Sequence, residues 1–143
     1  MNITLALLAD AANVSREGKL NVLGVFNTIG ASKFPVRHPR MVLVFRVEWT
    51  NAEAGTARDG EIKLMDADGR EHAKIDFRVS LPREGHGPVY RSNEIIDLTD
   101  TLFPHEGEYA VAILVNGEEK ARTELTIRAT PRADGGPPPE SRN

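Results

Sequence analysis

The sequence contains no cysteine. This absence excludes disulfide bonds, zinc–thiolate sites, iron–sulfur clusters and cysteine nucleophiles, and it fits a reducing compartment. Long apolar runs are also missing, since no stretch approaches the roughly 18 residues that a membrane-spanning helix needs. The apolar N-terminal segment lacks a positive leader and is interrupted by Asp10, which is not typical of a secretory signal. We therefore expect a cytoplasmic protein that does not span a membrane.

Positive charge is not concentrated anywhere along the chain. The 143 residues carry a formal net charge of −3. Because nucleic-acid binding needs clustered Lys and Arg to displace counterions, this composition argues against a nucleic-acid partner. Hydrophobic residues make up 40% and charged residues 27%, which is ordinary for a soluble globular domain, whereas aromatic residues reach only 6%. The length suits one domain with one core.

Apolar and polar residues alternate along several segments. In 71–81 and 120–129 every second residue is apolar or small and the residues between are mainly charged, which predicts half-buried strands. Segments 41–49 and 107–117 are apolar on both faces for part of their length, and we predict central strands there. Weaker strand patterns cover four further segments, 3–12, 19–29, 60–66 and 90–98.

Turn-forming residues separate these segments. DADG at 66–69 and NGEE at 116–119 are Asp-Gly and Asn-Gly hairpin signals. The two prolines within 34–40 favour a connection over a central strand. No segment has the pattern of a convincing amphipathic helix. The sequence therefore predicts an all-β fold, an antiparallel β-sandwich of about eight strands with immunoglobulin-like or related topology.

Two features bear on the limits and corners of this domain. Tyr109 follows a glycine by two residues and enters an alternating strand, as in the tyrosine corner of immunoglobulin-like sandwiches; a plain core aromatic is the alternative. The C-terminal segment is rich in Pro, Gly and charge, so we expect it to be disordered. The predicted organisation is a β-sandwich domain over 1–129 and a tail over 130–143.

The segment 5–26 holds two short motifs that have chemical meanings elsewhere. A P-loop is excluded because GK is followed by leucine, a strand and not a helix comes next, and Asn13 stands where the first glycine is needed. The NVS sequon at Asn13 matters only in a secreted protein. We expect a hairpin turn from Ser15 to Gly18, with Gly18 in the left-handed conformation.

Three residues are candidates for contact with a partner or ligand. Asp10 ends an otherwise apolar strand, so its carboxylate must be solvated or hydrogen-bonded. Asp10 and Asn13 have capping of nearby backbone amides as the structural alternative. Trp49, at the exit of a strong strand, is either an anchor for a partner or a partly buried rim aromatic. No residue is assigned as catalytic, cofactor-binding or metal-ligating.

Histidines and aspartates offer no local metal motif. No two histidines have H-x-H or H-x-x-x-H spacing, so we expect solvated loop side chains. Two histidines within about 4–5 Å of each other and beside a carboxylate would reverse this, because those are ligand-sharing distances. The aspartates could imitate a calcium loop, but the remaining EF-hand ligands are missing. No G-x-S-x-G elbow is present. The residues concerned are His38, His72, His86 and His105, with Asp66, Asp68, Asp97 and Asp100.

The segments LALLADAAN, GKLNVLGVFNTIG, FRVEW and LMDADGRE together resemble an uncharacterised bacterial family, a domain of unknown function. Its members open with L-x-D-x-A, followed by G-K-L and a V-x-G segment. The resemblance is clearest over 5–72 and looser through GEYAVAILVNG. It implies a small β-sandwich and brings no catalytic or binding residues to transfer. Members often have an aromatic residue after G-K-L and a Gly-rich, Trp-containing second strand, where this chain has Asn21 and GVFN (24–27).

Three functions are compatible with these observations. The first is a non-catalytic β-sandwich for protein–protein interaction or homo-oligomeric assembly, because no catalytic constellation is found and edge strands can pair with another chain. The second is a small-ligand or carbohydrate-binding sandwich that uses Trp49 and nearby loops. The third is a metal-dependent hydrolase that uses convergent loop Asp and His residues. The expected partner is another protein or a second copy of the chain, and no cofactor is expected.

Overall fold

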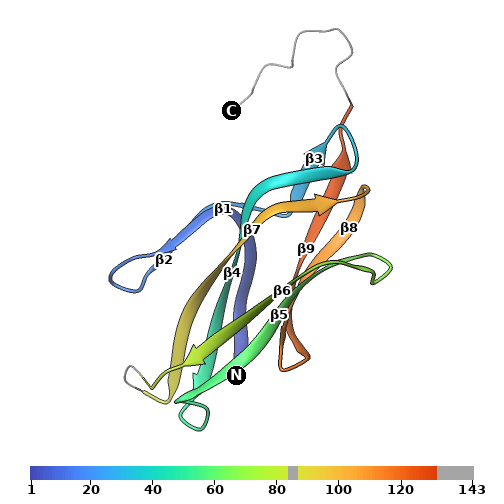
Figure 1. The fold of residues 1–143 in the computed structure, drawn as a ribbon. Coiled ribbons are helices and arrows are strands. Elements are labelled where there is room, and N and C mark those ends of the chain that lie inside the picture. Colours follow the sequence, from blue (N-terminus) through green and yellow to red (C-terminus); the bar gives the residue numbers. More distant parts are fainter. Residues whose placement is uncertain (84–86, 132–143) are drawn as a thin grey trace.

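Alternating side chains produce two sheets that pack face to face (Figure 1). The computed structural model describes residues 1–83 and 87–131, and these contain nine strands and no helix. There is accordingly no helix among them that is long and apolar enough to cross a membrane. The predicted all-β sandwich is confirmed. The strands are β1 (Asn2–Val14), β2 (Leu20–Phe26), β3 (Thr28–Ala31), β4 (Val36–Thr50), β5 (Thr56–Asp66), β6 (Glu71–Leu81), β7 (Val89–Phe103), β8 (Gly107–Val115) and β9 (Glu118–Ala129).

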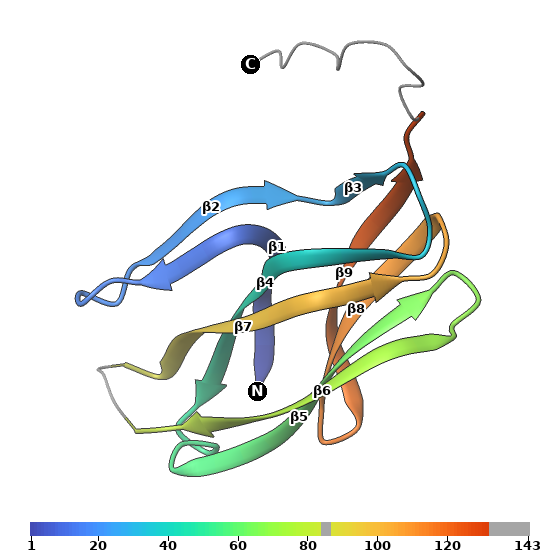
Figure 2. The same cartoon turned by 45° about the horizontal axis from the view of Figure 1, so that its top comes forward.

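The four-stranded sheet has the order β2-β1-β4-β7, and the five-stranded sheet has the order β3-β9-β8-β5-β6. Pairing is antiparallel between the described strands except for β3 and β9, which are parallel. β1 curves away from the sandwich and continues with β2 as a hairpin that projects from one side (Figure 2). The strands at the sheet edges are therefore β2, β7, β3 and β6.

The core lies between the sheets, where β4 and β8 contribute most. Four side chains of β4, at every second position from Met41 to Val47, are fully buried. Val42 and Val44 point to the opposite face of β4, and they too are buried, in a second apolar cluster with Ala9. This explains why segment 41–49 is apolar on both faces, as the sequence predicted for a central strand.

Several predictions about strand limits are wrong. β5 begins at Thr56 and β7 extends to Phe103, beyond the predicted segments 60–66 and 90–98. Segment 19–29 is two strands, because the chain passes from one sheet to the other at Asn27, whose carbonyl accepts a hydrogen bond from the Thr126 amide at 2.8 Å. Segment 34–40 is largely strand, since β4 begins at Val36. The pairing of β1 with β4 extends only to Val42, so Pro39 lies where β4 has β7 alone as a neighbour. A missing N–H is tolerated at such an edge position.

The predicted turns and the tyrosine corner are confirmed. Gly18 has φ +84°, and its amide donates to the Ser15 carbonyl at 2.9 Å. Asn116 and Gly117 both have positive φ, as a type I′ hairpin requires. The Tyr109 hydroxyl donates to the His105 carbonyl four residues upstream at 2.7 Å, which ties the connection between β7 and β8 to the start of β8. From residue 132 on, the tail predicted over 130–143 lies outside the described residues.

Candidate functional site

The part of the β1–β2 hairpin that leaves the sandwich, residues 10–25, is called the arm below (Figure 2). Its base depends on a glycine. Gly24 has φ +72°, and a β-carbon there would lie 2.3 Å from Oδ2 of Asp10. A left-handed backbone and a close neighbour both favour glycine at this position. The Asp10 side chain therefore fills space that Gly24 leaves open.

Some apolar side chains of the arm are covered and others are open to solvent. Ala12, Leu20 and Val22 are partly buried against the second apolar cluster on β4. Leu23 and Val25, on either side of Gly24, remain 72% and 62% exposed. Two apolar side chains that are this exposed on one strand mark a place where another surface can pack.

The outer edge of β2 has no strand beside it among the described residues. β2 has the sequence LNVLGVF, which carries no charge over seven residues. The other two long edges are protected by charged side chains, four each on β6 and β7, and β3 is only four residues long. Charge and short length are the usual protections of a sheet edge against pairing with another chain. β2 is seven residues long and uncharged, so it lacks both of these protections.

The three predicted contact residues occupy different surroundings. Asp10 is exposed at the base of the arm. Asn13 is also exposed, and its Oδ1 accepts a hydrogen bond from Nδ2 of Asn21 on β2 at 2.9 Å. Trp49 is only 3% exposed; its indole N–H donates to the Pro82 carbonyl at 3.2 Å, and its ring stacks on Tyr90. The structure brings Asp10 and Asn13 onto the arm, whereas Trp49 is part of the core.

A polar cluster lies where the β5–β6 hairpin meets the connection from β7 to β8. Asp66 ends β5 and is buried. Its Oδ1 accepts backbone hydrogen bonds from Asp68 at 2.9 Å and Arg70 at 3.0 Å, and its Oδ2 lies 2.7 Å from Nε2 of His72. The hydrogen bond with His72 is the largest cause of the lowered pKa of Asp66, with the backbone bonds adding to it and burial opposing it.

His105 completes this cluster from the other side. Its Nε2 lies 3.8 Å from Oδ2 of Asp66, and its Nδ1 lies 2.9 Å from the carbonyl oxygen of Glu106. One donor atom each from Asp66, His72 and His105 lie within 4.8 Å of one another. The ring of Tyr109 packs against both imidazoles, and burial raises the pKa of its hydroxyl. A metal site was left open for two histidines within about 4–5 Å of each other and beside a carboxylate, and this cluster meets that condition.

Sequence spacing did not predict this cluster because its histidines are far apart along the chain. Two sequence signals lie close to the cluster. The DADG turn places Asp66 at a hairpin, and the tyrosine corner fixes His105 four residues before Tyr109. The other acidic candidates Asp68, Asp97 and Asp100 are exposed and lie outside the cluster. His38 packs instead against Phe26 near the arm, and His86 lies outside the described residues.

An apolar groove of about 310 Å³ opens beside His72 between β6 and β7. Its lining is mainly aliphatic and comes from both sheets, and His72 is the one ring among the lining residues that are described. A small-ligand or carbohydrate site would be favoured by an aromatic platform. The groove lacks that platform, so it does not favour this alternative.

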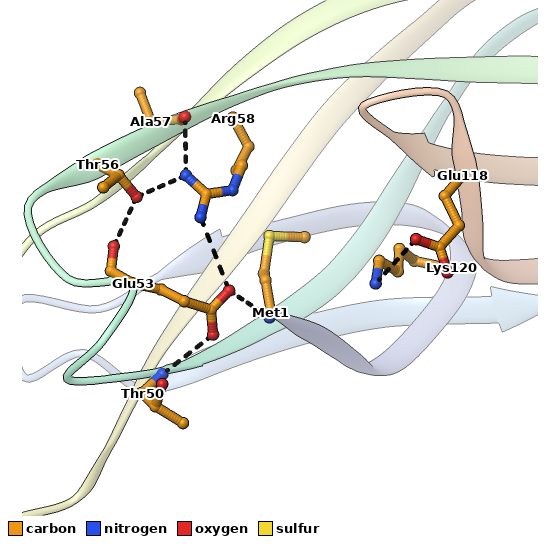
Figure 3. Close-up of polar contacts among 8 residues, drawn as sticks. All are labelled: Met1, Thr50, Glu53, Thr56, Ala57, Arg58, Glu118 and Lys120. Carbon is orange, nitrogen blue, oxygen red and sulfur yellow. Dashed lines mark hydrogen bonds and ion pairs between the residues drawn. The ribbon is translucent and has the colours of Figure 1, made fainter.

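A charged cluster at the β4–β5 connection is drawn in Figure 3. The carboxylate of Glu53 accepts hydrogen bonds from the amino group of Met1 and from the Thr50 amide, and it lies 3.9 Å from Arg58. The hydrogen bond from the amino group is the main cause of the lowered pKa of Glu53. Because each charge has a partner here, the cluster is explained by local stabilisation.

Comparison with known proteins places the chain in a family. Residues 4–128 match a family of unknown function, DUF6941. The chain belongs to this family. The predicted membership of an uncharacterised domain family is thereby confirmed, and the matched residues include both the arm and the Asp66 cluster. No curated protein matches the chain.

Two solved structures show limited similarity to the chain. One is a Pseudomonas fluorescens alkylpurine DNA glycosylase, AlkC, bound to DNA containing an abasic site analog, with 20% identity and a TM-score of 0.49. The match covers 90% of this chain and 30% of the glycosylase chain, so this chain spans less than a third of that protein. The other is an immunoglobulin-like protein from Pseudomonas aeruginosa, with 12% identity, a TM-score of 0.42, and coverage of 87% of this chain and 98% of that chain.

Proposed function

We propose that this protein is a non-catalytic assembly module in which β2 pairs with β2 of a second copy. The observation that carries the proposal is the seven-residue, charge-free edge strand with Leu23 and Val25 exposed beside it. An unpaired edge presents a row of N–H and C=O groups that another strand can satisfy. Of the long edges in the described part of the chain, β2 is the one without charged side chains that would oppose pairing with another strand.

A second copy is the occupant that the chemistry of this edge favours. Each chain carries a net charge of −3, so two copies repel one another weakly, and a contact surface without charge keeps this repulsion small. β2 provides such a surface. Closed two-fold dimers are the commonest homo-oligomers, and two copies of one strand pair antiparallel about such an axis. A cytoplasmic location for this assembly is consistent with the cysteine-free sequence.

Leu23 is the middle residue of β2, and we place the two-fold axis there. Leu23 of one copy then lies opposite Leu23 of the other, and Val25 lies opposite Asn21, because residues on one face of an antiparallel pair meet directly. The two four-stranded sheets join into one continuous sheet through β2.

The solution mass of the unmodified chain tests this proposal. Light scattering coupled to size-exclusion chromatography should report twice the chain mass of 15.7 kDa, with dissociation on dilution. Sedimentation velocity over a concentration series provides the dissociation constant. A strict monomer at the highest concentration that the protein reaches contradicts the proposal.

A further inference from the structure

We propose that Asp66, His72 and His105 form a binding site for a divalent transition-metal ion, with zinc preferred. Two imidazole nitrogens and one carboxylate oxygen are a donor set that zinc accepts, with a fourth position for water. Calcium and magnesium prefer sites made of oxygen alone, so two imidazoles disfavour them. The site is separate from the β2 edge, and the proposal does not depend on assembly.

The donor atoms are close to the spacing that zinc requires. Zinc lies about 2.0–2.2 Å from nitrogen and oxygen ligands, so two ligands of a tetrahedral ion are about 3.3–3.5 Å apart. The Oδ2 atom of Asp66 is 2.7 Å from Nε2 of His72 and 3.8 Å from Nε2 of His105. The first distance is about 0.6–0.8 Å shorter than this spacing and the second is about 0.3–0.5 Å longer. All three donor atoms lie within 4.8 Å of one another, and side-chain rotations would bring them around one ion.

In His105 and Asp66, the polar atom that would not bind the ion is held by hydrogen bonds, as is usual in metal sites. Nδ1 of His105 faces the Glu106 carbonyl at 2.9 Å, so this nitrogen carries the proton and Nε2 presents a lone pair toward Asp66. The Oδ1 atom of Asp66 is occupied by two backbone amides, which leaves Oδ2 as its single metal ligand. Zinc would take the place of the proton between Nε2 of His72 and Asp66, and a neutral His72 then carries its one proton on Nδ1, by exchange with solvent.

The ligands join two parts of the fold that are far apart in sequence. Asp66 and His72 belong to the β5–β6 hairpin, which lies in the five-stranded sheet. His105 lies on the connection that carries the chain from β7 in the four-stranded sheet to β8 in the five-stranded sheet. A bound ion would therefore fasten this crossover connection to the hairpin beside it. Binding to the folded state alone must raise the unfolding temperature.

The test is isothermal titration of tag-free, metal-depleted full-length protein with zinc chloride. We expect one ion per chain, a rise in unfolding temperature with added zinc, and visible absorption bands of tetrahedral cobalt when Co²⁺ replaces zinc. His105→Ala should weaken zinc binding by at least about tenfold, and His72→Gln should do the same. The imidazole of His105 is 55% exposed and alanine keeps the carbonyl that Tyr109 binds, so this variant should remain folded.

His38→Gln is the matched control, because His38 lies outside the cluster and should leave zinc affinity unchanged. Absence of zinc binding by the unmodified protein overturns the proposal. Zinc binding that neither His105→Ala nor His72→Gln weakens also overturns it. In either case the hydrogen bond between Asp66 and His72 is a structural clamp on the hairpin turn, and the proposed assembly through β2 is unaffected.

Discussion

Replacing Leu23 with lysine should convert the dimer to a folded monomer. Leu23 is 72% exposed in the single chain, so the substitution leaves the core intact. Across the two-fold axis it places two ammonium groups opposite each other. At roughly 5 Å and an effective dielectric of about 20, two like charges repel by about 3 kcal/mol. The lost burial of two leucine side chains adds to this repulsion. We expect the dissociation constant to rise by at least about 100-fold.

Val89→Lys is the matched control for Leu23→Lys. Val89 is an exposed apolar residue, 39% accessible, on β7 at the opposite edge of the same sheet. Val89→Lys also replaces an apolar side chain with lysine, but Val89 lies outside the proposed interface. Sedimentation velocity should therefore show a dimer for Val89→Lys and a monomer for Leu23→Lys. Equal weakening by both variants contradicts pairing through β2, as does a Leu23→Lys variant that still dimerises with the affinity of the unmodified chain.

Phe45→Ala should remove a large part of the stability of the sandwich. Phe45 is fully buried at the middle of β4, and its ring centroid lies 5.5 Å from that of Phe77 on the opposite sheet. Phe77 in turn covers Gly60, where a β-carbon would come within 2.2 Å of its ring. Truncating a buried phenylalanine costs about 3–5 kcal/mol, because transfer free energy is lost and a cavity remains. Domains of this kind have a total stability of about 5–15 kcal/mol.

Urea unfolding followed by the fluorescence of Trp49 measures this change in the free energy of unfolding. Leu102→Ala is the comparison, since Leu102 is apolar but 40% exposed on β7, and it should cost much less. If Phe45→Ala and Leu102→Ala destabilise the protein equally, Phe45 is not at the centre of a packed core.

Periodicity predicted most of the fold because most strands have one covered face and one wet face. β6 follows this pattern over most of its length, and its predicted limits agree with the structure, whereas β9 begins at Glu118, two residues before the predicted 120–129. The strand change at Asn27 was missed because apolar residues continue across it. The inward-facing position shifts there from an even number, at Phe26, to an odd number, at Ile29. An alternation pattern does not state which sheet a strand joins.

The candidate sites depend on contacts that periodicity does not contain. Leu23 and Val25 are visible in the sequence as apolar residues of a strand, but their exposure depends on how the arm packs on Val42 and Val44 of β4. His72 and His105 come together because β6 starts beside the tyrosine corner. Separation along the chain hides such proximity, whereas the turn residues that create it are visible in the sequence.

Pairing of β2 with β2 of a second copy can be tested by one covalent bond. The chain has no cysteine, so Leu23→Cys introduces a single thiol per copy. Residues opposite each other in an antiparallel pair have α-carbons about 4.5–5.5 Å apart, within the range of about 4.4–6.8 Å that a disulfide spans. Mild oxidation of Leu23→Cys should give a covalent dimer on a non-reducing gel, and Val89→Cys should stay monomeric. A Leu23→Cys variant that remains uncrosslinked, or that crosslinks no faster than Val89→Cys, contradicts the assembly proposed for this protein.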